Sequence, residues 1–288
     1  MRAPAPATVL RRRAPPLGLA AWTSLGLLTL IVLFAVFGGW LTPYEYDASN
    51  LLARNRPPLG LGGTLEHPLG TDPLGRDTLA RLVVATRISI LVALLGTISG
   101  ACLGTLLGIW AVRQGGLVDD LVMAAVDVQA SLPFIVIALA VVAFFGNSLA
   151  LFLVLMGIFG WEVYARQVRA AILAETAKPY VTAARALGLG DAALYRRHLM
   201  PNIAYVLIVQ FTLNFPQTIL LETGLSFLGL GIQPPLTSLG RMLGEARDGL
   251  IDRPWAAVIP GVLIFATALA VSFLGDRLRD RLDPTLSE

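Results

Sequence analysis

Long uncharged runs of mostly apolar residues alternate with short charged segments along this chain. The runs cover residues 14–44, 88–112, 128–161, 199–221 and 254–275. A helix rises about 1.5 Å per residue, so about 20 apolar residues cross the roughly 30 Å hydrocarbon core of a bilayer. The run at 128–161 is long enough for two crossings and has a turn signal, Gly146-Asn147, near its middle. The pattern predicts an all-α integral membrane protein with six transmembrane helices.

Blocks of arginine predict how these helices are oriented. Arg11, Arg12 and Arg13 precede the first run, basic residues outnumber acidic ones in residues 162–198, and three arginines follow the last run. Because such residues are enriched in cytoplasmic loops, we expect both ends of the chain and residues 162–198 in the cytoplasm. The expected organisation is a cytoplasmic tail at 1–18, a first transmembrane helix at 19–41, an external segment at 42–83, a core of five helices at 84–276 with a coupling loop at 165–200 and an external loop at 223–253, and a cytoplasmic tail at 277–288.

Composition excludes several classes of protein. Hydrophobic residues make up 56% of the chain, charged residues 14%, and the mean hydropathy is +0.71, which excludes a soluble globular protein. The net charge of +3 does not indicate nucleic-acid binding, because the arginines lie between apolar runs and not along one surface. Cys102 is the only cysteine, so no disulfide forms within the chain. Lys178 is the only lysine and Pro179 follows it, which excludes a Gly-Lys-Ser/Thr phosphate loop.

Residues 179–201 form a polar, cationic segment between two apolar runs. Pro179 is typical of the first turn of a helix and Gly188 of its end, so we expect a helix of about two turns. Tyr180, Ala183, Ala184 and Leu187 are spaced i, i+3, i+4, i+7 and would form one apolar face with small residues at its centre. Such a face favours insertion of the helix into a groove of another protein. The alternative is a helix lying on anionic lipid, with Arg185, Arg196 and Arg197 facing outward.

The spacing of Ala183-Ala184, Gly188 and the ending His198-Leu199-Met200-Pro201 resembles the cytoplasmic coupling loop of ABC-transporter permeases. Two positions depart from the family pattern: Thr182 stands where a glutamate is frequent, and His198 where an isoleucine is frequent. Further segments resemble the dipeptide, oligopeptide and nickel permeases, and specifically the second of their two permeases. They are residues 70–77, 115–120, 222–231, 233–235, 274–280 and 282–284.

The resemblance implies a type I ABC-importer permease fold with a cytoplasmic coupling helix, in the bacterial cytoplasmic (inner) membrane. It implies a homologous companion permease, one or two ATPase subunits that hold ATP and Mg²⁺, and an external solute-binding protein; this chain itself would bind no cofactor and catalyse no reaction. The residues that it assigns to contact with the ATPase are Tyr180, Thr182, Ala183, Ala184, Arg185, Leu187, Gly188 and Pro201. A peptide is the expected solute, and a nickel chelate, glutathione or another small solute is the alternative.

Two other classes of protein stay open from the residues alone. A proton-coupled secondary transporter would place ionisable residues at mid-span, which the uncharged runs do not show. A purely structural or receptor-like membrane subunit would leave the segment at 179–201 unexplained. His67 and His198 are the only histidines, which disfavours direct binding of nickel by this chain.

A stripe of amides in the fifth run is the candidate solute pathway. Gln210, Asn214 and Gln217 are spaced i, i+4, i+7, and amides facing lipid would lack hydrogen-bond partners, so the stripe should point inward. Pro216 should kink the helix there. Glu222 would meet the amino terminus of a peptide near the outer mouth. The alternative is that these amides bond to neighbouring helices.

Local signals predict four further features. Gly96, Gly100, Gly104 and Gly108 recur every four residues and should form a smooth helix face for close packing of another helix. Residues 70–77 are expected to form turns before a helix capped by Asp77, with a calcium loop as the alternative.

The other two features are the position of Asp127 and the structure of residues 239–250. Asp127 should lie at the inner interface or be paired, with Arg113 or Arg87 as candidate partners. Residues 239–250 are expected to form an amphipathic helix at the outer interface.

Overall fold

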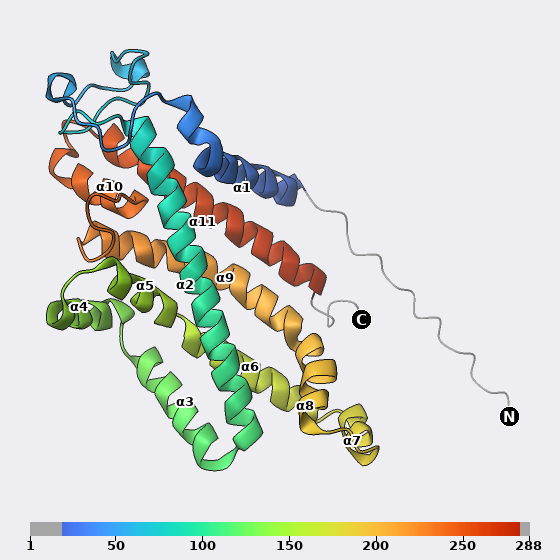
Figure 1. The fold of residues 1–288 in the computed structure, drawn as a ribbon. Helices are drawn as coiled ribbons and strands as arrows, with labels where there is room; N and C mark the ends of the chain where they lie inside the picture. The colour runs from blue at the N-terminus through green and yellow to red at the C-terminus, as the bar shows by residue number, and fades with distance from the viewer. Residues whose placement is uncertain (1–18, 283–288) are drawn as a thin grey trace.

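The computed structural model describes residues 19–282, and every regular element in that range is a helix (Figure 1). The expected tail at 1–18 and residues 283–288 of the expected tail at 277–288 lie outside this range. The α-helices are α1 (Leu19–Phe37), α2 (Thr78–Gln114), α3 (Gly116–Ser131), α4 (Phe134–Phe145), α5 (Leu149–Ile158), α6 (Trp161–Thr176), α7 (Pro179–Ala186), α8 (Asp191–Leu194), α9 (Met200–Phe227), α10 (Leu239–Ala246) and α11 (Trp255–Leu282). Short turns of 3-10 helix are η1 (Gly38–Leu41), η2 (Leu51–Ala53), η3 (Leu59–Leu61) and η5 (Arg247–Gly249), and η4 (Tyr195–Leu199) is a π-helical turn.

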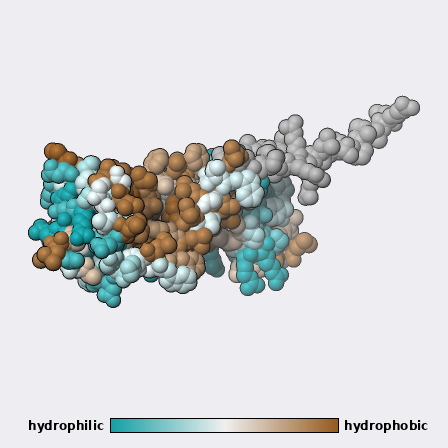
Figure 2. All heavy atoms as spheres, turned by 90° about the horizontal axis from the view of Figure 1, so that it is seen from above, coloured by the Kyte–Doolittle hydropathy of each residue, from teal (hydrophilic) through white to brown (hydrophobic). Residues whose placement is uncertain are grey.

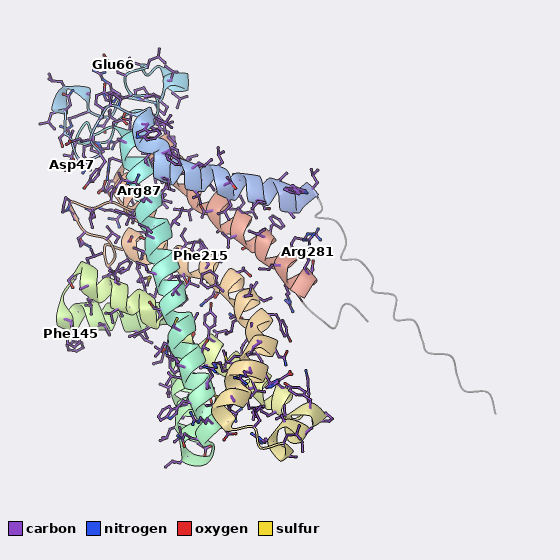
Figure 3. The ribbon with its side chains drawn as sticks, turned by 45° about the vertical axis from the view of Figure 1, so that its right-hand side comes forward. Asp47, Glu66, Arg87, Phe145, Phe215 and Arg281 are labelled. Atoms are coloured by element: carbon purple, nitrogen blue, oxygen red, sulfur yellow. The ribbon has the colours of Figure 1, made fainter. Side chains whose placement is uncertain are left out.

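Five helical segments of residues 19–282 are long and apolar enough to cross a membrane, and the bent pair α3 and α4 counts as a sixth. The prediction of an all-α membrane protein is therefore confirmed. Figure 2 shows hydrophobic residues gathered over the middle of the molecule and hydrophilic ones toward its two ends. Figure 3 shows Phe145 at the free tip of α4, where it is 77% exposed, whereas Phe215 of α9 lies among the helices. A largely apolar exterior is the surface that a bilayer requires.

Helix α2 runs the length of the molecule and packs against α5, α6 and α9 (Figure 1). The glycine stripe is the reason that α5 and α6 approach so closely. A Cβ added at Gly96 would lie 2.9 Å from the carbonyl oxygen of Met156, and one added at Gly108 would lie 2.7 Å from that of Ala165. Backbone therefore lies directly on the glycine face, as the four-residue spacing predicted.

The third crossing differs from the prediction. An uncharged run from Val128 suggested a helix beginning there, but α3 begins at Gly116 and carries Asp119, Asp120 and Asp127 along its length. The helix then stops at Leu132, because the ring of Pro133 disfavours a helical conformation of the residue before it. Helices α3 and α4 meet at an angle of 91°.

Helices also extend into segments that were expected to be loops. Helix α6 occupies residues 165–176 of the expected coupling loop at 165–200, and α9 continues through Phe227 into the expected external loop at 223–253. Helix α2 begins at Thr78, as a cap at Asp77 predicted, and so enters the expected external segment at 42–83; the side chain of Asp77 accepts a hydrogen bond from the amide of Ala80 at 2.8 Å. The charged residues on these extensions form ion pairs within the protein, so these segments can be helical without leaving unpaired charges.

Two ends of the molecule matter for function. We call the end with residues 42–77 and α10 the loop end, and the opposite end the α7 end (Figure 1). Helix α1 begins and α11 finishes away from the loop end, which agrees with an even number of crossings. The expected amphipathic helix at 239–250 is α10 followed by the short turn η5. Helix α10 packs on α9, α11 and α2, and Leu239, Gly240, Met242 and Ala246 are buried.

Candidate functional site

Helix α7 forms the core of the expected coupling segment. Pro179 occupies its first turn, and Gly188 ends it with a φ of +83°, a conformation that costs glycine nothing. The amide of Gly188 donates to the carbonyl of Arg185 at 2.9 Å, and that of Leu189 to the carbonyl of Ala184 at 3.1 Å. These two bonds satisfy the last carbonyls of the helix.

A single carboxylate holds α7 against two long helices. Glu175, in the last turn of α6, accepts hydrogen bonds from the hydroxyl of Tyr180 at 2.8 Å and from the amide of Asn202 at 3.2 Å. The ammonium of Lys178 lies 2.6 Å from its other oxygen. The hydrogen bond with Glu175 raises the pKa of Lys178, which stays protonated at neutral pH. Glu175 thus joins the end of α6, the start of α7 and the first turn of α9.

The apolar face of α7 is split in the structure. Val181 is 1% exposed and packs with Leu194, Leu199 and other residues of α6, α8 and α9, which turns Tyr180 and Ala184 inward. Leu187 is 88% exposed and Ala183 is also exposed. The four residues therefore do not share one environment: burial of Val181 sets the rotation of the helix, so that one side of the predicted face packs on the permease and the other side is exposed.

The outward surface of α7 is defined here by Thr182, Ala183, Arg185, Ala186 and Leu187, all exposed. Apart from Arg185 and Leu187 these are small residues, so another surface can approach the helix backbone closely. Gly188 is exposed beside this surface, and Pro201 is exposed in the first turn of α9.

Three of the four expected pathway residues are buried within this chain. Gln210 is 8% exposed, Asn214 1% and Glu222 0%, whereas Gln217 is exposed. Helix α9 is continuous through Pro216. Gln210 and Asn214 are therefore buried against other helices of this chain and Gln217 is not, so the three amides do not share one environment.

Glu222 binds within the protein at the loop end. Its carboxylate accepts hydrogen bonds from the hydroxyl of Ser226 at 2.7 Å and from that of Ser89, on α2, at 2.9 Å. The Ser89 oxygen in turn accepts from the amide of Leu239 at 3.1 Å, at the start of α10. Glu222 thus joins α9, α2 and α10. In this conformation its carboxylate is closed off from a solute.

Asp127 pairs with a residue that sequence reasoning did not name. Its carboxylate lies 2.8 Å from the guanidinium of Arg166 on α6. Arg87 instead donates to the carbonyls of Ala35 and Val36, and Arg113 forms no ion pair with Asp127. The proposed partners were wrong because α3 runs beside α6, which the sequence pattern did not indicate.

A second link fixes the same helix pair. Two guanidinium nitrogens of Arg169, Nε and Nη2, donate to the two carboxylate oxygens of Asp119, each at 2.6 Å. A two-point pair of this kind is strong and directional. The charges of the α6 extension are therefore taken up by α3.

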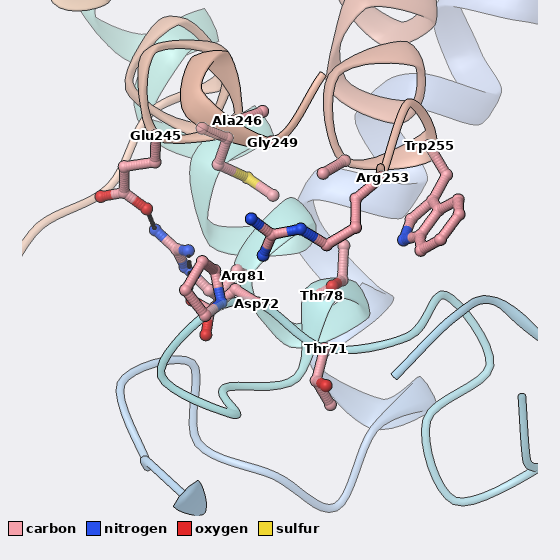
Figure 4. Close-up of a pocket in the computed structure, with 12 residues that line it drawn as sticks. Thr71, Asp72, Thr78, Arg81, Glu245, Ala246, Gly249, Arg253 and Trp255 are labelled. Carbon is pink, nitrogen blue, oxygen red and sulfur yellow. Dashed lines mark hydrogen bonds and ion pairs between the residues drawn. The ribbon is translucent and has the colours of Figure 1, made fainter. Parts of the chain in front are cut away.

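A network of charges at the loop end was also missed (Figure 4). Arg81, 3% exposed, lies 2.6 Å from Asp72 and 2.7 Å from Glu245. Arg76 contacts the same two carboxylates at 2.6 and 3.3 Å. Arg253 reaches the adjoining small cavity from the opposite side (Figure 4). Its guanidinium donates to the side-chain oxygen of Asn55. These contacts tie residues 42–77 to α2, α10 and the start of α11. The only sequence signal for them was the position of Arg253 just before the uncharged run at 254–275.

The alternative of a calcium loop at residues 70–77 has no support in the geometry. Asp77 is committed to capping α2 and to His67, whose ring nitrogen lies 2.8 Å from its carboxylate. Asp72 is committed to Arg76 and Arg81. Within residues 19–282, no cluster of three histidine, cysteine or acidic side chains has the geometry to hold a metal ion.

Comparison with known proteins identifies this architecture. Residues 100–288 match the family described as "Binding-protein-dependent transport system inner membrane component", and residues 20–58 match "N-terminal TM domain of oligopeptide transport permease C". The chain therefore belongs to this family of permeases, the membrane subunits of type I ABC importers. It is a multi-pass membrane protein. Membership of this family excludes the alternative of a proton-coupled secondary transporter.

Individual relatives cover most of the chain. It is 39% identical over 258 residues to the "Di/tripeptide transport system permease protein DppC" of Pseudomonas aeruginosa, covering 89% of this chain and 85% of the relative. It is 38% identical over 257 residues to the "Glutathione transport system permease protein GsiD" of Pectobacterium atrosepticum, covering 89% and 84%.

A solved structure shows the same fold. A chain from inward-facing conformations of the MetNI methionine ABC transporter matches with a TM-score of 0.58 at 20% identity, covering 70% of this chain and 96% of that one.

Proposed function

We propose that this permease imports small peptides, forms half of the translocation pathway and couples it to separate ATPase subunits. The relatives support the choice of solute, because one is named for di- and tripeptides and another for glutathione, itself a tripeptide. Glutathione or another small solute is the alternative within the same family. We further propose that a companion permease supplies the other half of the pathway and that an external solute-binding protein delivers the solute.

The outward surface of α7 is the observation that carries the coupling role. We place the ATPase contact on its exposed residues Thr182, Ala183 and Leu187, together with Gly188. Arg185 instead lines a pocket beside this surface. Small side chains let a groove close on the helix backbone, which is the helix-in-groove mode of binding. Tyr180 and Ala184 face the permease itself and position the helix. Pro201 begins α9 directly behind it.

The contacts around Glu175 suggest how movement of α7 reaches the membrane helices. A displaced α7 takes with it the last turn of α6 through Tyr180 and the first turn of α9 through Asn202. Helix α6 packs along α2. ATP-driven closure of the ATPase subunits would then shift α6, α9 and α2 together and alternate the access of the pathway, as rigid-body switching does in other proteins.

For the pathway itself, the geometry favours Gln217. It is the one member of the predicted set whose side chain is exposed on this chain. Gln210, Asn214 and Glu222 are buried and are better suited to holding helices together. With α7 in the cytoplasm, the loop end faces outward and receives the solute-binding protein.

Replacement of Ala183 by aspartate tests the coupling role. The new carboxylate would be desolvated in the ATPase groove, which costs several kcal/mol when it has no partner. We expect ATPase subunits to be lost on purification, while the variant chain still inserts into the membrane. The matched control is Ala192→Asp, because Ala192 is exposed on α8 outside the outward surface of α7. Normal ATPase retention and transport by Ala183→Asp would contradict the proposal.

A further inference from the structure

A pocket of about 370 Å³ lies at the α7 end, beside the outward surface of α7, which contributes Arg185 to its lining. It is bounded by the ends of two membrane-spanning helices, α2 and α6, and by the segment from α7 to η4. The residues used in the argument are Val112, Arg113, Leu173, Arg185, Asp191 and Tyr195. Since α2 ends at Gln114 and α6 at Thr176, the pocket lies at the ends of two helical segments that are long and apolar enough to cross a membrane.

The charged wall of this pocket carries an excess of positive charge. Arg113 is exposed and forms no ion pair within residues 19–282. Arg185 has Asp191 as its partner, but at 3.8 Å and with both side chains more than half exposed, so the pair is weak. Two guanidinium groups against one carboxylate leave a formal charge of +1 on the lining. That is the complement of one phosphodiester.

Part of the wall is apolar. Val112, Leu173 and Ala177 contribute to the lining, and Leu173 is 44% exposed. A free phosphate ion would gain nothing from such a wall, whereas the glycerol and first acyl carbons of a lipid would be buried against it. Tyr195 also lines the pocket, and its hydroxyl is a group that can donate to an oxygen of the ligand.

We propose that this pocket binds the headgroup of an anionic phospholipid. Arg113 and Arg185 donate to the phosphodiester oxygens, which is the geometry that guanidinium groups favour, and the acyl chains leave past Val112 and Leu173. Basic pockets between membrane helices bind lipid headgroups on the same principle. A lipid held here touches α2, α6 and the α7 segment at once, and so braces the helix that we propose couples to the ATPase. The binding site itself does not depend on that proposed coupling.

The test is lipid binding to the full-length chain, purified in detergent with any subunits that it retains. Native mass spectrometry would count bound phosphatidylglycerol, and phosphatidylcholine of the same acyl chains would serve as the uncharged comparison. We expect Arg113→Gln to weaken phosphatidylglycerol binding about tenfold, because a charge-assisted contact is lost. Arg113→Lys, which keeps the charge but not the planar guanidinium, should bind phosphatidylglycerol more tightly than Arg113→Gln and less tightly than the unmodified chain. Asp191→Asn should strengthen binding, since it removes the only acidic side chain of the lining.

Arg197→Gln is the matched control, because Arg197 is exposed at the same end and does not line the pocket. It should leave binding within about twofold of the unmodified chain, as expected for a screened surface charge. Equal losses in Arg113→Gln and Arg197→Gln would show diffuse attraction without a site and would overturn the proposal. So would equal binding of phosphatidylcholine, or displacement of the lipid by millimolar inorganic phosphate, which would make the pocket a site for the free ion.

Discussion

The contact between the glycine stripe of α2 and the backbone of α6 can be tested at Gly104. A Cβ placed there would lie 2.7 Å from the Cβ of Tyr164 and 3.0 Å from the amide nitrogen of Ala165. Non-bonded carbon atoms normally approach to about 3.5–4.0 Å. The change Gly104→Ala would therefore push α2 and α6 apart by about 1 Å, because both nearby groups belong to or adjoin the backbone and cannot rotate away.

Three contributions set the expected change in the free energy of unfolding, two of them destabilising and one stabilising. Overpacking of a dense interior destabilises by about 1–3 kcal/mol. Separation of the helices adds to this, since a gap of 0.5–1 Å forfeits a quarter to a half of the dispersion energy at each contact. Alanine favours a helix over glycine by about 1 kcal/mol, which offsets part of the loss. We expect a net destabilisation of about 2 kcal/mol.

Thermal unfolding of the purified chain in detergent measures this, and Gly26→Ala in α1 is the control. An added Cβ at Gly26 meets no atom within 4 Å, so that variant has the propensity gain without the clash. The melting temperature should fall in Gly104→Ala and stay level or rise in Gly26→Ala. Unchanged stability of Gly104→Ala would refute the close approach of α2 and α6.

Two further predictions concern α9. Gln217→Leu should slow peptide uptake by the assembled transporter without lowering its thermal stability, whereas Asn214→Leu should lower stability with little change in uptake per surviving complex; the reverse pattern would move the pathway to the buried face. Glu222→Leu should destabilise the chain in thermal unfolding by about 1–3 kcal/mol for each hydroxyl left without an acceptor, because Ser89 and Ser226 both donate to the buried carboxylate. Glu222→Gln keeps an acceptor and should lose less, and equal losses would contradict a role in hydrogen bonding.

Features that depend on local chemistry were predictable from the sequence. Pro179 and Gly188 bracket α7 because each restricts or permits particular backbone angles regardless of its surroundings. Asp77 caps α2 because its acceptor lies next to the free amides of the first turn. The glycine stripe predicted close packing because four-residue spacing on a helix produces one smooth face. None of these needs knowledge of a distant segment.

Features that depend on distant partners were not predictable. The run of uncharged residues from Val128 concealed α3, because the charges that precede it are neutralised by Arg166 and Arg169 about 40 to 50 positions away. The rotation of α7 is set by Val181, whose burial requires Leu194 and Leu199 to fold back over it. Helical spacing alone placed Tyr180 and Leu187 on the same side of α7, yet Tyr180 packs on the permease and Leu187 is exposed.

The distribution of these contacts indicates which parts of the chain move as one body. Helix α2 is joined to α6 by backbone contact along the glycine stripe, and to α9 by hydrogen bonds of Thr97 with Thr218 at 3.1 Å and of Ser89 with Glu222. Sliding any of these three helices past another would break buried polar bonds or open a gap in a dry interface, where no water restores the loss. Helix α4, by contrast, ends in exposed Phe144 and Phe145 and joins α3 at a sharp break. We therefore expect force applied at α7 to rotate α2, α6 and α9 together, with the relative motion confined to the α3–α4 break.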